Sequence, residues 1–150
     1  MTLREITHYA LDVPYAPEDV IRTLVDFSDR RPLIWRETSH PAVYRLHRLA
    51  ATEADVTEGV PISWSRERYD WSEPGFVRLR QIDSNMASPG GTITYRVTAT
   101  PGGCHIECDR SRTFIGPRGH LLGWLMVVFG AWILKAQPRS GLDRALGGKR

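Results

Sequence analysis

The segment GHLLGWLMVVFGAWILK, at Gly119–Lys135, is a helix-length apolar run near the C-terminal end of the chain. The 14 residues from Leu121 to Leu134 include no charged side chain, so a helix here has no polar face. A helix that is hydrophobic all round must be covered on both sides. One sheet covers only one side, and the other side needs a bound apolar molecule, a partner subunit or a lipid surface. Crossing a bilayer takes about 20 residues, so we interpret the run as a buried or interfacial helix.

Length and composition predict one globular domain over residues 1–150. The chain has 41% hydrophobic and 25% charged residues, which is ordinary for such a domain. Residues Met1–Glu5 lack the features of a secretory signal. Cys104 and Cys108 fall in one predicted strand, about 13 Å apart, whereas a disulfide needs Cα atoms about 5.5–6 Å apart. We expect two free core cysteines and a cytoplasmic protein.

The net charge of +3 is unevenly distributed. Residues 1–115 carry 14 Arg and 16 Asp plus Glu, a charge of −2, whereas residues 116–150 carry six basic residues against Asp143 alone, a charge of +5. Excess positive charge beside an apolar helix suits anionic lipid headgroups. The strands carry a balanced mix of charges, so nucleic-acid binding is not expected. The alternative interpretation is a solubilising basic tail, frayed from about residue 139.

The rest of the chain predicts one strand, a helical pair and six further strands. Thr7–Tyr15 alternates apolar and polar residues, as a strand does. Ala16–Asp19 has the proline and acidic residues of a helix start, and a second short helix follows through Leu33–Trp35. Turn signals then separate predicted strands that form an antiparallel meander with one apolar face: Val43–Ala51, Thr52–Glu58, Pro61–Trp71, Phe76–Asp83, Gly91–Thr100 and Cys104–Phe114. The apolar helix follows Gly116-Pro117, and Pro138 is expected to break or kink it.

This order of elements resembles the START/Bet v 1-like helix-grip (SRPBCC) superfamily, in its polyketide cyclase/dehydrase and lipid-transport branch. Local patterns at Ala16–Val20 and Trp64–Arg68 add to the resemblance. The resemblance implies an α+β helix-grip fold. In that fold a seven-stranded curved antiparallel sheet wraps around a long C-terminal helix, with two short helices between the first and second strands. An apolar cavity is expected between the sheet and the last helix.

Aromatic residues and two arginines are the candidate cavity residues. If Trp64 points inward, strand periodicity turns Ile62, Arg66 and Arg68 inward as well, unless a bulge intervenes. Arginines on an apolar face need an anionic or carbonyl-bearing partner; the alternative is that both point to solvent and pair with nearby acidic residues. The expected ligand-binding residues are Trp35, Ile62, Trp64, Arg66, Leu79, Tyr95, Cys108, Trp124, Val128 and Trp132.

The resemblance also implies a candidate catalytic residue, Arg68. Aromatase/cyclase members of the superfamily have a cavity-facing arginine on the fourth strand, and Arg68 matches that position. The stretch Arg31–Thr38 keeps the proline, the leucine and an aromatic residue of their Trp-Pro-x-Leu-Phe-x-x-Tyr motif, but lacks its first tryptophan and its tyrosine. Because arginine alone is a poor proton shuttle, binding is favoured over catalysis. The five histidines show no metal-ligand spacing, and no metal or cofactor is expected.

Three functions follow from these observations. The first is binding or transport of a small hydrophobic or amphipathic molecule, such as a lipid, a polyketide or an isoprenoid. The second is a polyketide cyclase, aromatase or dehydratase-like activity using Arg68. The third is a homodimer or a peripheral contact with the inner membrane face through the outer side of the apolar helix. For that side we expect Leu122, Met126, Phe129 and Ile133, with Leu121, Trp124, Val128 and Trp132 turned inward.

Overall fold

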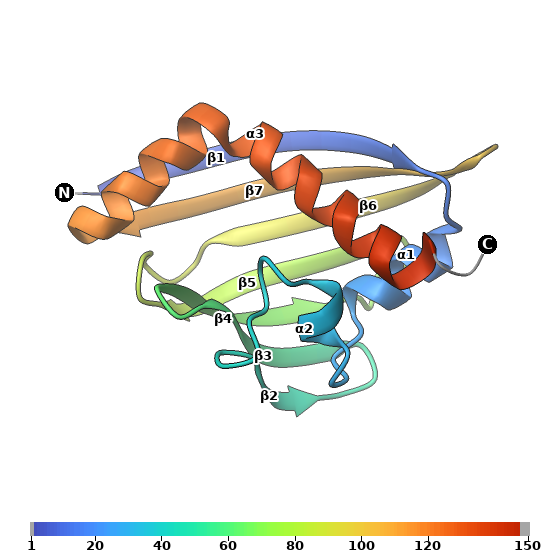
Figure 1. Cartoon of the computed structure of the whole chain (residues 1–150), viewed down its shortest axis with the longest axis horizontal. Coiled ribbons are helices and arrows are strands. Elements are labelled where there is room, and N and C mark those ends of the chain that lie inside the picture. The colour runs from blue at the N-terminus through green and yellow to red at the C-terminus, as the bar shows by residue number, and fades with distance from the viewer. Residues whose placement is uncertain (1, 148–150) are drawn as a thin grey trace.

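A computed structural model describes the chain from residue 2 to residue 147 (Figure 1). The chain begins with strand β1 (Thr2–Val13) and two short helices, α1 (Pro17–Leu24) and α2 (Arg31–Ile34). It ends with the long helix α3 (Gly116–Leu146). Between these lie β2 (Arg45–Leu49), β3 (Glu53–Val60), β4 (Ser63–Asp70), β5 (Phe76–Ser84), β6 (Thr92–Thr100) and β7 (Gly103–Ile115).

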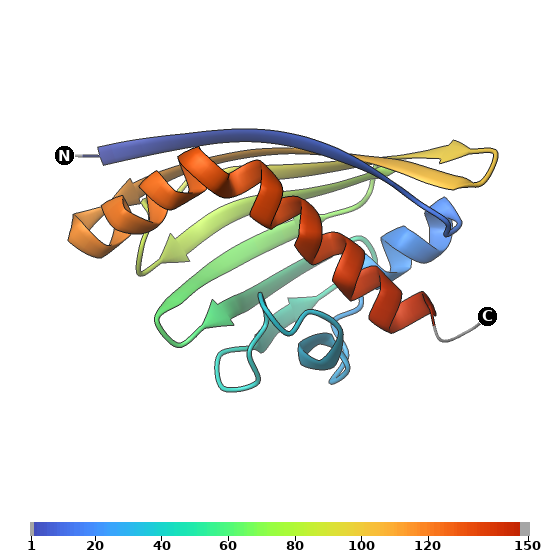
Figure 2. The same ribbon diagram turned by 45° about the horizontal axis from the view of Figure 1, so that its top comes forward.

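The strands form one antiparallel sheet in the order β1-β7-β6-β5-β4-β3-β2. Strand β1 pairs with β7 along its whole length, from Thr2 opposite Ile115 to Val13 opposite Cys104. The sheet curves, and α3 crosses its concave side (Figure 2). This is the α+β helix-grip arrangement with two short helices between the first two strands, as the sequence predicts.

The concave face is built by alternation along the strands. Tyr9, Leu11 and Val13 of β1 are buried, as are Val77 and Leu79 of β5. The residues next to them along each strand, such as His8, Asp12 and Arg78, are exposed, because successive side chains of a strand point to opposite faces. On β7 the free cysteines Cys104 and Cys108 are core residues, as predicted. The core therefore lies between the concave face and the helices.

Helix α3 bends in its middle. Its halves, Gly116–Gly130 and Trp132–Leu146, meet at 80°. Of the break or kink expected at Pro138, the break is wrong, since the helix continues through Pro138 to Leu146. Glycine weakens a helix interior and is a common site of kinks, and Gly130 lies at the bend. Among residues 2–147 no single helix is long and apolar enough to cross a membrane; the two halves satisfy length and composition only as a bent pair.

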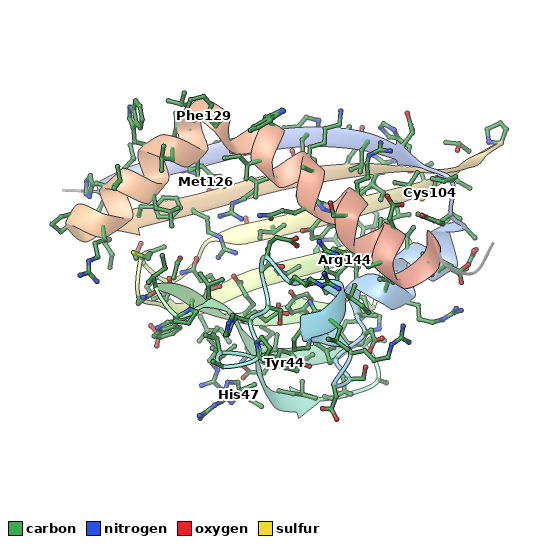
Figure 3. All side chains as sticks on the ribbon, in the orientation of Figure 1. Tyr44, His47, Cys104, Met126, Phe129 and Arg144 are labelled. Atoms are coloured by element: carbon green, nitrogen blue, oxygen red, sulfur yellow. The ribbon has the colours of Figure 1, made fainter. Side chains whose placement is uncertain are left out.

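The last turns of α3 are held against the body of the protein. Leu142 is fully buried, and Arg144 donates hydrogen bonds to the carboxylate of Glu37 and to the carbonyl oxygen of Ile34 (Figure 3). These contacts explain why residues 139–146 are helical, so the expectation of a frayed tail from residue 139 is wrong for this part. Lys149 and Arg150 lie outside the described residues.

Glycines lie where α3 comes closest to the rest of the protein. A Cβ atom at Gly119 would lie 2.5 Å from the carbonyl oxygen of Met86, and one at Gly123 would lie 2.7 Å from the Phe114 ring. One at Gly141 would lie 2.2 Å from the Trp35 ring. A side chain at any of these three positions would collide with these neighbours, so the glycines let the helix backbone approach them closely.

The inner and outer sides of α3 are mostly the reverse of those predicted. Met126 is buried against the sheet and Leu122 is half-buried, whereas Phe129 points away, as predicted (Figure 3). Ile133 is half-buried. The predicted inward set is wrong, because Met126 and Leu134 occupy the inner side together with the glycines; the members of that set are exposed: Leu121, Trp124, Val128 and Trp132.

Candidate functional site

A cavity of about 350 Å³ lies between the concave face of the sheet, α2 and α3. Helix α3 contributes Leu122, Met126 and Leu134 to its wall, and strands β5 and β6 contribute Leu79 and Ile93. Small-molecule sites are typically concave, mostly apolar and about 300–1,000 Å³ in volume. The cavity predicted between the sheet and the last helix is therefore present and large enough for a small ligand.

Four of the predicted ligand-binding residues line this cavity: Trp35, Trp64, Leu79 and Tyr95. Trp35 follows α2 and is buried against Gly141 of α3. Cys108 is fully buried in the core, outside the cavity wall. Burial raises the pKa of the Cys108 thiol to about 11, so the thiol is protonated at neutral pH and serves as a core residue.

The arginines of β4 do not reach the cavity, and the prediction that they face it is wrong. The pairing of β4 with β5 shifts register between Arg66 and Glu67, and Glu67 and Tyr69 are the side chains that turn inward. Arg66 instead forms two hydrogen bonds of 2.8 Å with the carboxylate of Asp55, which lowers the pKa of Asp55. Arg68 is exposed, so it cannot contact a ligand in the cavity.

The remaining predicted residues are also outside the cavity. Ile62 is 74% exposed in the turn between β3 and β4. Trp124, Val128 and Trp132 lie on the outer side of α3, with Trp124 56% and Trp132 79% exposed. Trp35, Trp64 and Tyr95 are therefore the predicted aromatic residues in the cavity wall, beside Tyr9, Tyr69 and Phe114, and no tryptophan of α3 lines it.

One buried polar cluster joins the α1–α2 corner to the sheet. Arg31, at the start of α2, forms an ion pair with Glu58 of β3 and also donates hydrogen bonds of 3.0 Å to the carbonyl oxygens of Leu24 and Asp26. The Tyr69 hydroxyl donates to Glu58 at 2.5 Å, and burial raises the pKa of Tyr69. Because the hydrogen-bonding groups of this cluster are paired with one another, it holds the cavity wall in place.

A second buried cluster lies on β4, β5 and β7, and sequence reasoning missed it. Arg112 donates hydrogen bonds to Glu67 and to the side-chain oxygen of Gln81. Ser65 donates to the same Glu67 oxygen at 2.9 Å. Arg110 pairs with the fully buried Glu5 of β1 at 2.9 Å. Arg112, Glu67 and Gln81 all line the cavity, so they place polar chemistry in an apolar wall.

Three polar atoms of cavity-lining residues are buried and make no hydrogen bond among the described residues. They are Glu67 Oε2, Gln81 Nε2 and Trp35 Nε1. A buried polar group without a partner costs about 1–3 kcal/mol. One of these atoms accepts and two donate, so the residues that line the cavity hold unpaired hydrogen-bonding groups of both kinds.

The sequence of β7 contains a pattern that could have predicted the buried arginines of this second cluster. The alternation that buries Cys104, Ile106 and Cys108 continues to Arg110 and Arg112. Following that alternation past Cys108 places both arginines on the concave face. Within residues 2–147, no group of three or more His, Cys, Asp and Glu residues is arranged to hold a metal ion.

Comparison with known proteins shows the fold. No protein-family model and no curated protein matches this chain significantly. Among solved structures, the di-domain aromatase/cyclase StfQ from the steffimycin biosynthetic pathway is 17% identical over 95% of this chain, with a TM-score of 0.68. The chain spans about half, 49%, of that protein.

Two further solved structures are similar along most of both chains. Norcoclaurine synthase from Thalictrum flavum is 13% identical, with 97% of this chain and 88% of that chain covered and a TM-score of 0.67. A START superfamily protein from Mycobacterium smegmatis is 10% identical, with 99% and 95% covered and a TM-score of 0.63. The chain has the START/Bet v 1-like helix-grip fold that its order of elements resembles.

Proposed function

We propose that the protein binds a small amphipathic molecule in the cavity between the sheet and α3. The observation that carries this proposal is the set of buried, unpaired polar atoms on Trp35, Glu67 and Gln81 within an apolar wall. The apolar body of the ligand packs on residues such as Leu79 and Met126. Its polar end accepts hydrogen bonds from Trp35 and Gln81 and donates one to Glu67.

An aromatic polyketide has the chemistry that this wall selects. Such a molecule combines flat apolar rings with carbonyl and hydroxyl groups, which match the donors and the acceptor. The similarity in fold to the aromatase/cyclase StfQ supports this class over a lipid or an isoprenoid, although one fold hosts many functions. A saturated lipid chain would leave the polar atoms of Glu67 and Gln81 unpaired.

Native mass spectrometry of the purified protein, followed by solvent extraction, tests this function. We expect a co-purifying molecule with an apolar framework that bears both hydroxyl and carbonyl groups. A protein that carries nothing and binds no polyketide-like phenol on titration would contradict the proposal. A bound molecule without any polar group would contradict the role of Glu67 and Gln81.

A second candidate function is cyclase or dehydratase-like catalysis by a different arginine from the one predicted. Arg112 lines the cavity beside Glu67. A guanidinium group can stabilise a developing oxyanion, and a carboxylate can accept a proton. In variants that circular dichroism shows to be folded, turnover of an aromatic polyketide precursor should be lost in Arg112→Met and kept in Arg68→Ala. Equal loss in both variants would contradict this assignment.

The cellular location and any partner are separate proposals from the ligand. The cytoplasmic location expected from the sequence stays a prediction. The exposed side of α3 is the surface on which a membrane or a second copy of the chain would act, and it faces away from the cavity.

A further inference from the structure

Helix α3 presents an apolar surface to solvent. We call it the α3 outer face and define it by seven exposed apolar residues. The two tryptophans alone, Trp124 and Trp132, are 56% and 79% exposed. Large exposed apolar patches on soluble proteins mark interaction sites. The α3 outer face consists of Leu121, Trp124, Leu125, Val127, Val128, Phe129 and Trp132.

Exposed cations flank this surface, and no acidic residue lies within it. Arg118 precedes the α3 outer face, Lys135 follows it, and both are exposed. Neither forms an ion pair with any residue between positions 2 and 147. The first acidic residue of α3 is Asp143, near its end, and the Tyr15 hydroxyl donates a hydrogen bond to it.

The charges of Arg118 and Lys135 favour one of the two surfaces that can cover the α3 outer face, a second copy of the chain or a membrane. In a symmetric dimer the same patch is used on both subunits, so Arg118 and Lys135 of one copy would oppose the cations of the other. An anionic bilayer offers the opposite charge together with an apolar interior. Tryptophans are enriched at the headgroup level of membranes, and basic residues beside an apolar helix face favour anionic lipid.

We propose that the α3 outer face docks onto an anionic phospholipid bilayer, with α3 lying in the interface and not crossing it. Trp124 and Trp132 enter the headgroup region, and Arg118 and Lys135 pair with lipid phosphates. The inner side of the same helix supplies Leu122 and Met126 to the cavity wall. Docking therefore places one wall of the cavity at the membrane surface. This inference does not depend on which ligand the cavity holds.

Vesicle co-sedimentation of the full chain tests the inference. We expect binding to phosphatidylcholine vesicles that contain phosphatidylglycerol and little binding to phosphatidylcholine alone. Added salt should weaken binding, because the screening length falls from about 10 Å at 0.1 M to about 3 Å at 1 M. The double variant Trp124→Ser with Trp132→Ser should lose binding. Arg118→Gln and Lys135→Gln should each weaken binding about fivefold, the equivalent of about 1 kcal/mol per cation.

Two control variants lie away from α3. Ile62→Ser removes an equally exposed apolar residue in the β3–β4 turn, and Arg80→Gln removes an exposed cation of β5. Both should bind like the wild type, and circular dichroism should show every variant folded. Equal binding to neutral and anionic vesicles would overturn the proposal. A tryptophan-dependent dimer that ignores vesicles would overturn it in favour of a second copy. Retention of the cavity ligand in the same variants reports separately on the proposed function.

Discussion

At the scale of single residues, the buried ion pair of Glu67 and Arg112 determines what the cavity can bind. Arg112 satisfies one carboxylate oxygen of Glu67 and the oxygen of Gln81, which leaves Glu67 Oε2 and Gln81 Nε2 for a ligand. Arg66, which the sequence analysis assigned to the cavity, lies on the opposite face of β4 from Glu67 and pairs with Asp55. Arg66 and Glu67 are neighbours on β4, so strand alternation puts their side chains on opposite faces of the sheet.

We predict that breaking the Glu67–Arg112 pair on one side destabilises the fold strongly. Arg112→Met leaves the carboxylate of Glu67 buried and uncompensated, which costs about 3–5 kcal/mol. Replacing both partners, Glu67→Leu with Arg112→Met, should recover most of that loss. Urea denaturation measures the free energy of unfolding. Arg66→Met, at the more exposed pair, is the control and should cost much less; an equal loss would contradict the account.

A second residue-scale prediction concerns alkaline pH. Burial raises the pKa of Cys108 from 9.0 to about 11, so the folded state favours the neutral thiol. The resulting stabilisation is complete below pH 9 and is lost as pH rises through 11. The free energy of unfolding should therefore fall across this range, and less steeply in Cys108→Ala. Identical pH slopes for the two proteins would contradict the burial of this thiol.

At the scale of elements, α3 shows what the sequence could and could not predict. Its existence and its place after β7 follow from the apolar run and from Gly116-Pro117. Its orientation does not follow, because every side of the run is apolar and no polar face distinguishes inside from outside. The glycines at 119, 123 and 141 determine the inner side by allowing close approach to Met86, Phe114 and Trp35.

We predict that Gly141→Ala destabilises the protein, although alanine is the better helix former. A Cβ atom there would lie 2.2 Å from the Trp35 ring, and overpacking typically costs about 1–3 kcal/mol. Gly130→Ala is the matched control, since its Cβ would have its nearest contact at 3.4 Å. Thermal unfolding should show a lower midpoint for Gly141→Ala only. Equal midpoints would mean that α3 packs less closely on Trp35 than the structure shows.

At the scale of the whole molecule, the sequence predicted the fold and part of the cavity wall, but it did not predict the polar residues of that wall. The strand alternation and turns predict the meander, and the helix-grip order predicts a cavity; of the ten residues expected to bind a ligand there, Trp35, Trp64, Leu79 and Tyr95 line it. The polar residues of the wall were missed because charged side chains in strands usually mark the solvent face. Here they continue the buried face of β7 beyond its apolar residues.

Ligand titration by calorimetry into two variants of α3 tests the central claim most directly. The ligand is the molecule that co-purifies with the wild-type protein. Met126→Trp fills the cavity from the inner side of the helix, whereas Val128→Trp adds the same side chain on the exposed outer side. The account predicts that Met126→Trp loses binding and that Val128→Trp keeps wild-type affinity. Unchanged affinity in Met126→Trp would show that the ligand is not held between the sheet and α3.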